Sequence, residues 1–188
     1  MNRLVVAMTG ASGAVYGIRL LEILRGQVES HLILTQWAKK TIEIETQHSI
    51  EEVASLASFV HDNGDLSDPL ASGSFKTEGM VVIPCSIRTL SAVANSQSST
   101  LVDRVADVHL KERRKLILCV RETPLHLGHL RLMERAAECG AILLPPVPAF
   151  YYKPRTINDV IDHTIGKMLD MLDIEHDLFR RWEGDRDG

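Results

Sequence analysis

The sequence has 188 residues, 45% of them hydrophobic and 24% charged, and its 21 basic and 25 acidic residues give a formal net charge of −4. This length fits one domain with a single sizeable core, and the composition excludes a disordered, collagen-like or disulfide-scaffold protein. The negative net charge excludes a protein that binds nucleic acid by bulk electrostatics, so an anionic ligand would need a local basic pocket.

The pattern of cysteines and the lengths of the apolar runs indicate the cellular compartment. The three cysteines are Cys85, Cys119 and Cys139, and they form neither a CxxC pair nor a zinc pattern with histidine. The first apolar run, residues 4–8, is too short for a signal-peptide core, and no run approaches the length that spans a membrane. We therefore predict a cytoplasmic protein that does not enter a membrane.

Short apolar runs alternate with amphipathic stretches along the chain. Runs typical of buried parallel strands span residues 4–8, 31–35, 80–85, 116–120 and 141–144. Stretches with apolar residues every three or four positions, as in helices packed on a sheet, span residues 15–25, 86–95, 101–113, 127–139 and 157–172. This alternation predicts a single doubly wound α/β domain over residues 1–188, with a flavodoxin- or Rossmann-like parallel sheet flanked by helices.

Three segments fall outside this alternation. Residues 36–74 contain two expected helices and end in a Gly-, Asp- and Ser-rich stretch, 61–74, which we interpret as a long mobile loop. Prolines at positions 145, 146 and 148 exclude a helix and are expected to hold the chain extended across the edge of the sheet. The tail, about 174–188, keeps Leu178, Phe179 and Trp182 among charges, so we expect it to dock on its own body or on a neighbouring subunit.

The turn after the first strand, Thr9-Gly10-Ala11-Ser12-Gly13, has the residues of an anion site. Its glycines let the backbone approach a phosphate, and the following helix start offers free N–H groups with positive dipole character. The turn matches neither GxGxxG nor GxxxxGK[ST], the usual dinucleotide and ATP patterns. From this motif alone, a plain helix cap by Ser12 is an equal alternative.

Polar residues also follow the third and fourth predicted strands. Residues 86–89, Ser-Ile-Arg-Thr, and the pair Arg121-Glu122 should reach the same sheet edge as the first turn, where ligands bind in doubly wound sheets. A glutamate held near an arginine stays ionised and can still exchange a proton with a ligand. The alternative is that Ser86 only caps a helix and Arg88 is solvated, and we expect Cys85 to pack in the core rather than to act as a nucleophile.

The remaining polar clusters are weaker signals. Residues 104–114 are rich in basic side chains, which favours a solvated, salt-bridged helix face. His126 and His129 lack the neighbours of a metal site, so no metal is predicted. Tyr151 and Lys167 supply a hydroxyl and an ammonium that fit either a phosphate clamp or an ordinary surface.

Four blocks of the sequence together resemble the UbiX-type flavin prenyltransferases, formerly described as phenylacrylic acid or 3-octaprenyl-4-hydroxybenzoate decarboxylases. The blocks are GASGA at 10–14, PCSIRTL at 84–90, LKERRKLILCVRETPLHLGHLRLM at 110–133 and GAILLPPVPAFY at 140–151. The resemblance runs over nearly the whole chain. It implies a homo-oligomer, often a dodecamer, in which FMN lies at the carboxyl edge of the sheet and neighbouring subunits complete the pocket.

The resemblance implies two sets of binding residues. The FMN set is Gly10, Ala11, Ser12, Thr35, Ser86, Ile87, Arg88, Thr89 and Arg121. The set for the phosphate of dimethylallyl phosphate is Arg104, Lys111, Arg121, Tyr151 and Lys167. By this resemblance the basic helix face becomes an anion clamp that acts across a subunit interface.

The implied reaction joins a dimethylallyl group from dimethylallyl phosphate to N5 and then C6 of reduced FMN, without a metal, and the prenylated FMN serves a UbiD-type decarboxylase. Glu122 would protonate the leaving phosphate and later accept the C6 proton, with Ser12 assisting. Trp182 would close over the pocket. The alternatives are an FMN-dependent aromatic acid decarboxylase, a flavin carrier subunit and a cysteine decarboxylase that acts on a peptide.

Overall fold

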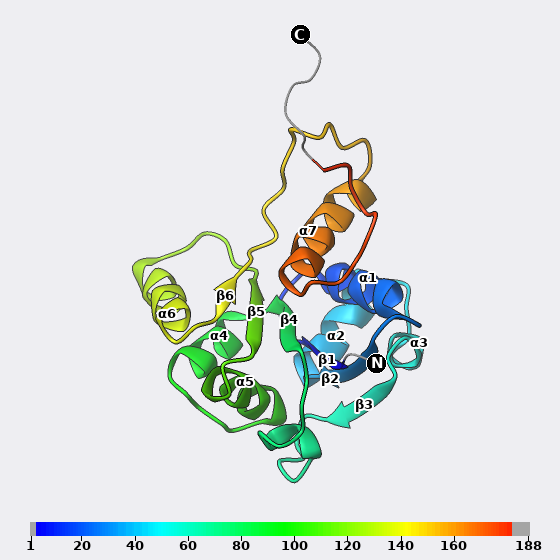
Figure 1. Cartoon of the computed structure of the whole chain (residues 1–188). Coiled ribbons are helices and arrows are strands. Elements are labelled where there is room, and N and C mark those ends of the chain that lie inside the picture. The colour runs from blue at the N-terminus through cyan, green and yellow to red at the C-terminus, as the bar shows by residue number, and fades with distance from the viewer. Residues whose placement is uncertain (1–2, 182–188) are drawn as a thin grey trace.

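The computed structural model describes residues 3–181 and contains a parallel sheet of six strands with helices on both faces (Figure 1). The strands are β1 (Arg3–Met8), β2 (Glu29–Leu34), β3 (Phe59–Asp62), β4 (Gly79–Cys85), β5 (Lys115–Val120) and β6 (Ile142–Leu143). Their order across the sheet is β3-β2-β1-β4-β5-β6, which confirms the predicted doubly wound class. The order reverses between β1 and β4, and ligands of open α/β sheets bind at such a switch point.

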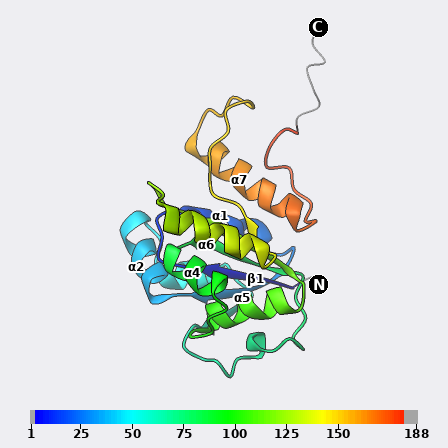
Figure 2. The ribbon, with the colours of Figure 1, turned by 90° about the vertical axis from the view of Figure 1, so that its left-hand side faces the viewer.

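The helices form two layers. They are α1 (Ala14–Leu24), α2 (Gln36–Glu45), α3 (Ile50–Ser55), α4 (Ile87–Ala94), α5 (Leu101–Lys111), α6 (Leu127–Glu138) and α7 (Ile157–Met171). Side chains of β1 alternate between the two cores: Leu4, Val6 and Met8 face the core of α1, α2 and α7, whereas Val5 and Ala7 face the core of α4 and α5. Figure 2 shows α7 and α1 above the sheet and α5 below it. Within residues 3–181, no helix is both long and apolar enough to cross a membrane.

The strand β3 was not predicted. It pairs only with β2, at the edge of the sheet, and its residues Phe59 and Val60 are 52% and 53% exposed. A half-solvated edge strand carries no continuous apolar run, which is the pattern that marks the central strands. The predicted loop over 61–74 therefore begins inside a strand, and a short 3-10 turn, Pro69–Ala71, interrupts it.

The proline segment also differs from expectation. Figure 1 shows the chain leading away from the sheet after β6, rather than across its edge, before α7 returns over α1. The reason is that α7 packs on the helix layer that contains α1, so the extended proline segment must run from the sheet to the outer side of that layer. Part of the tail packs on its own body, as expected: a Cβ at Gly166 of α7 would lie 2.4 Å from the ring of Phe179, and Leu178 packs against the α1 core. Trp182 lies outside the described residues.

His109 on α5 is a buried histidine that has no carboxylate partner among the described residues. It is 1% exposed, its Nδ1 donates to Val105 O at 2.7 Å, and its Nε2 lies 2.8 Å from Thr77 Oγ1. Burial lowers its pKa from 6.5 to about 4. The imidazole is therefore neutral in the folded protein and packs as a core residue.

This histidine predicts an acid-sensitive fold. Below pH 6.5, His109 is protonated in the unfolded chain but stays neutral in the folded protein. The contribution of the neutral His109 to the free energy of unfolding is therefore complete above pH 6.5 and is lost as the pH falls toward 4. The loss amounts to roughly 3 kcal/mol. Urea unfolding at pH 7 and pH 4.5 measures it, with His109→Gln as the variant that cannot titrate. Equal acid losses in the wild type and the variant would contradict this assignment.

Candidate functional site

A cleft opens at the carboxyl edge of the sheet, beside the switch point between β1 and β4. Its volume is about 560 Å³, within the range of ligand pockets. The lining residues are Thr9, Gly10, Thr35, Gln36, Trp37, Asn63, Ser86, Ile87, Arg88, Thr89, Thr100 and Glu122. Seven of the residues predicted for FMN or catalysis, Gly10, Thr35, Ser86, Ile87, Arg88, Thr89 and Glu122, are thus brought together.

The start of α4 forms one wall of the cleft. Ser86 is its N-cap and accepts a hydrogen bond from Thr89 N at 3.3 Å, while Ser86 N donates to the buried hydroxyl of Thr9 at 2.8 Å. The N–H groups of Ile87 and Arg88, in the first turn, have no carbonyl of their own helix within reach. With the positive end of the helix dipole, this wall suits an anion such as a phosphate.

The start of α1 already holds a carboxylate. Glu45 Oε2, from the end of α2, accepts hydrogen bonds from Gly13 N at 2.8 Å and Ala14 N at 3.0 Å. Two of the N–H groups predicted to bind a ligand phosphate are therefore used by the protein itself. The alternative of a plain cap by Ser12 is also wrong, because the N-cap is Gly13, in a left-handed conformation with φ 106°, and glycine has no side chain with which to cap the helix.

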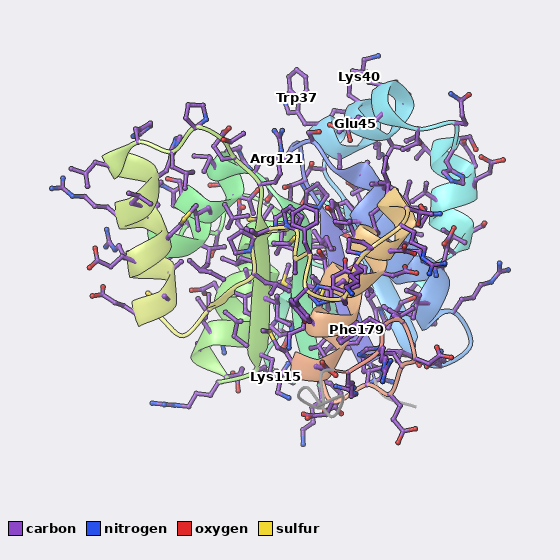
Figure 3. All side chains as sticks on the ribbon, turned by 90° about the horizontal axis from the view of Figure 1, so that it is seen from above. Trp37, Lys40, Glu45, Lys115, Arg121 and Phe179 are labelled. Atoms are coloured by element: carbon purple, nitrogen blue, oxygen red, sulfur yellow. The ribbon has the colours of Figure 1, made fainter. Side chains whose placement is uncertain are left out.

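Glu45 links this helix start to other predicted site residues. Partial burial opposes its ionisation, yet hydrogen bonds from Ser12, Gly13 and Ala14, together with the charge of Arg121, bring its pKa below the usual value. Figure 3 shows Glu45, Arg121 and Trp37 at one edge of the molecule and Lys115 at the opposite edge. Sequence reasoning missed Glu45 because it lies at the end of a helix, not after a strand.

The turn at Gly10 is pressed against α2. A Cβ at Gly10 would lie 2.3 Å from Trp37 Cβ, so the approach requires glycine. Thr35 caps α2 by accepting a hydrogen bond from Ala38 N at 3.1 Å. This packing leaves Trp37 72% exposed at the rim, where its indole gives the cleft an aromatic surface.

Arg121 and Glu122 are placed differently from the predicted pair. Among the described residues no ion pair joins them; Arg121 N bonds to Cys85 O at 3.1 Å, and its charge acts on Glu45. Glu122 is exposed in the cleft, and its Oε1 accepts a hydrogen bond from Thr123 N at 2.9 Å. Glu122 is thus accessible to a ligand, as a proton-transferring group must be.

Four residues predicted to bind the substrate phosphate do not converge within one chain. Arg104 donates to Ala71 O at 3.2 Å and Asp107 at 3.1 Å, and Tyr151 OH lies 2.8 Å from His163 Nε2. Lys111 pairs with Glu112 at the far end of α5, about 16 Å along the helix from the cleft. Lys167 lies 4.0 Å from Asp170 on α7.

Two of the cysteines, Cys85 and Cys119, and the pair His126 and His129 have structural roles. Cys85 and Cys119 are fully buried, and burial raises the pKa of both thiols, that of Cys119 to about 12, which agrees with a packing role for Cys85. His126 caps α6 and packs against His129, with ring centroids 3.6 Å apart and the ring planes tilted by 37°. Within residues 3–181 no three His, Cys, Asp or Glu side chains gather as a metal would require.

Comparison with known proteins identifies the family. Residues 1–182 match the family model described as Flavoprotein. The flavin prenyltransferase UbiX of Salmonella typhimurium is 55% identical over 188 residues, which covers 98% of this chain and 100% of that protein. The chain belongs to the UbiX-type flavin prenyltransferase family. The resemblance seen in the four sequence blocks is thereby confirmed.

Solved UbiX structures agree with this placement. The crystal structure of AnUbiX in complex with FMN and dimethylallyl pyrophosphate superposes with a TM-score of 0.95 at 48% identity, covering 97% of this chain and 98% of that one. A dodecameric FMN-dependent UbiX-like decarboxylase from Escherichia coli superposes with a TM-score of 0.94 at 47% identity, covering 97% and 100% of the two chains.

The cleft of this UbiX-family chain fits FMN on its own geometry. The open start of α4 and the Arg88 side chain suit the phosphate, the Gly10 turn allows close backbone approach, and Trp37 offers an aromatic face to a flat ring. The filled start of α1 shifts the expected phosphate position from residues 10–13 to residues 86–89.

Glu45→Gln tests the filled helix start. The amide still accepts hydrogen bonds but lacks the charge that complements the helix dipole, so the free energy of unfolding should fall by about 1 kcal/mol. Glu43→Gln, on the same helix and paired with Lys40 at the surface, is the matched control and should change stability by less than about 0.5 kcal/mol. Urea unfolding compares the two, and equal losses would argue against a special role for Glu45.

Proposed function

We propose that the chain is a flavin prenyltransferase that joins a dimethylallyl group from dimethylallyl phosphate to N5 and C6 of reduced FMN. The observation that carries this proposal is the cleft that combines an open helix start, a cation and an accessible glutamate. Support comes from the full-length match to UbiX prenyltransferases and from the complex of AnUbiX with FMN and dimethylallyl pyrophosphate.

The residues expected to hold FMN form two groups. Ser86, Ile87, Arg88 and Thr89 would bind the phosphate, and Gly10 and Thr35 of the same cleft would hold part of the remainder. The family resemblance adds Ala11, Ser12 and Arg121 to this second group. When bound and reduced, FMN supplies the nucleophilic atoms that accept the prenyl group. The protein's part is to orient both reactants, exclude water and stabilise the charge of the departing phosphate.

Glu122 is the proposed acid and base. Its carboxyl group is exposed in the cleft, so in the protonated form it can give a proton to an oxygen of the departing phosphate. The carboxylate left behind can then accept the proton released from C6, which restores the acid for the next turnover. Ser12 assists by position, because its hydroxyl donates a hydrogen bond to the ionised Glu45 and is thereby held at the start of α1. No step assigned to these residues requires a metal.

We further propose that copies of the chain assemble, as the dodecameric relative does, with pockets at the interfaces. This arrangement explains why Arg104, Lys111, Tyr151 and Lys167 lie apart in one chain: some of them serve the pocket of a neighbour. Several cations around one phosphate would replace a metal as the counter-charge.

The same proposal covers the biological setting. Residues 1–188 act as one flavoprotein domain with a tail from about residue 174, and the protein works in the cytoplasm. Its product, prenylated FMN, is delivered to a UbiD-type decarboxylase. A direct aromatic acid decarboxylase and a passive flavin carrier remain the alternatives to test, although an exposed glutamate among phosphate-binding groups serves no purpose in a carrier.

Glu122→Gln tests the proton-transfer role. The variant should bind FMN with unchanged affinity, while prenylation falls by about 10²- to 10⁴-fold because the amide cannot exchange a proton. Mass spectrometry of the flavin after incubation with reduced FMN and dimethylallyl phosphate measures the product. Normal turnover would refute the role, and release of carbon dioxide from an aromatic acid without a partner protein would favour the decarboxylase.

Mixed assemblies test the shared pocket. Glu122→Gln and Lys111→Ala should each be inactive alone, but co-expression should restore part of the activity, because some pockets then receive both wild-type residues from different chains. Light scattering should show an oligomer for all the proteins. A monomer, or the absence of any restored activity, would contradict the interface model.

A further inference from the structure

A buried carboxylate that has no hydrogen-bond partner in the described part of the chain lies behind the cleft. Asp103, on the first turn of α5, is 1% exposed. Neither of its carboxylate oxygens has a hydrogen-bond partner among residues 3–181. Buried carboxylates normally accept hydrogen bonds or pair with a cation, because a medium of low dielectric otherwise disfavours the charge. Asp103 therefore needs a positive partner.

Arg88 is the cation that faces it. Arg88 Nη2 lies 3.7 Å from Asp103 Oδ2, close enough for an ion pair but too long for a hydrogen bond. Arg88 is the second residue of α4, its side chain is 61% exposed, and it lines the cleft. One member of the pair is thus fixed in the interior, and the other reaches into the ligand site.

Helix capping does not explain Asp103. An acidic residue at the third helical position usually reaches back to the N-cap backbone. Asp159 does so at the start of α7, where it accepts a hydrogen bond from Thr156 N at 2.9 Å. Asp103 occupies the equivalent position after Thr100 but makes no such bond. Its carboxylate is turned to Arg88 instead.

We propose that Asp103 is a positioning residue that holds Arg88 for the phosphate group of FMN. This inference rests on the FMN site of the proposed function and not on prenyl transfer. A guanidinium presents five N–H donors in a planar fork, so one edge can face Asp103 while the other stays available to a phosphate. Restricting an exposed arginine before the ligand arrives reduces the rotamer freedom that binding would otherwise remove.

The proposal predicts selectivity for the phosphorylated flavin. Riboflavin shares the ring system and the ribityl chain of FMN but lacks the phosphate. A residue that acts only through Arg88 on that phosphate should affect FMN affinity and leave riboflavin affinity unchanged. General damage to the cleft would weaken both ligands.

Isothermal titration calorimetry on the full chain tests this with Asp103→Asn, Arg88→Gln and the double variant. Each single change should weaken FMN binding about tenfold, the double variant should bind no more weakly than Arg88→Gln, and riboflavin affinity should stay within about twofold. Asp107→Asn removes a carboxylate one turn along the same helix, where it pairs with Arg104, and should bind both flavins as the wild type does.

Unchanged FMN affinity in Asp103→Asn, losses that multiply in the double variant, or equal weakening of both flavins would each overturn the inference. If urea unfolding shows that Asp103→Asn does not fold, Arg88→Lys replaces it as the test variant, because lysine retains the positive charge but lacks the planar fork of donors. The affinity of Arg88→Lys for FMN should fall while its affinity for riboflavin does not. Unchanged FMN affinity in this variant would overturn the inference. A wild type that binds neither flavin would refute the proposed function as well, whereas normal FMN binding without prenylation would refute that function alone.

Discussion

The buried hydroxyl of Thr9 joins the ends of β1 and β4, donating to Pro84 O at 2.7 Å and accepting from Ser86 N at 2.8 Å. These bonds lie where the strand order reverses, so they fix the Gly10 turn against the start of α4. The cleft, the Ser86 cap and the reach of Arg88 all depend on this spacing. Because one hydroxyl both donates and accepts, the two hydrogen bonds strengthen each other and fix the spacing between the ends of β1 and β4.

The two helix starts that border the site have opposite tasks. At the start of α1, the carboxylate of Glu45 accepts the N–H hydrogen bonds and offsets the positive end of the helix dipole, whereas the start of α4 is left open toward the cleft. Both offer the same dipole and the same unpaired N–H groups, so their difference comes from the side chains that α2 and α5 bring near. The protein thereby directs an anion to one of two similar positions, with Asp103 and Arg88 on the chosen side.

Much of the fold was predictable because central parallel strands carry continuous apolar runs, as residues 4–8 and 116–120 do. The edge strand β3 was not, since half of its surface meets water. The turn at 9–13, residues 86–89 and the pair Arg121-Glu122 followed from the positions of the strand ends, whereas Thr35 came only from the family resemblance. Glu45 and Asp103 could not be found this way, because their roles arise where one helix meets the end of another element. Glu45 has no local sequence pattern, and Asp103 follows Thr100 in the spacing of a capping box, which predicts only a helix cap. The separation of Lys111 from the cleft likewise required the length and direction of α5.

The contact between Gly10 and Trp37 has an optical consequence. The sequence contains two tryptophans, and Trp37 is held at the rim of the cleft by backbone packing that allows no side chain at Gly10. An indole so fixed and so exposed emits in a polar environment until something aromatic covers it. The emission of Trp37 should therefore shift and quench as the cleft fills, which provides a spectroscopic signal of occupancy without any added label.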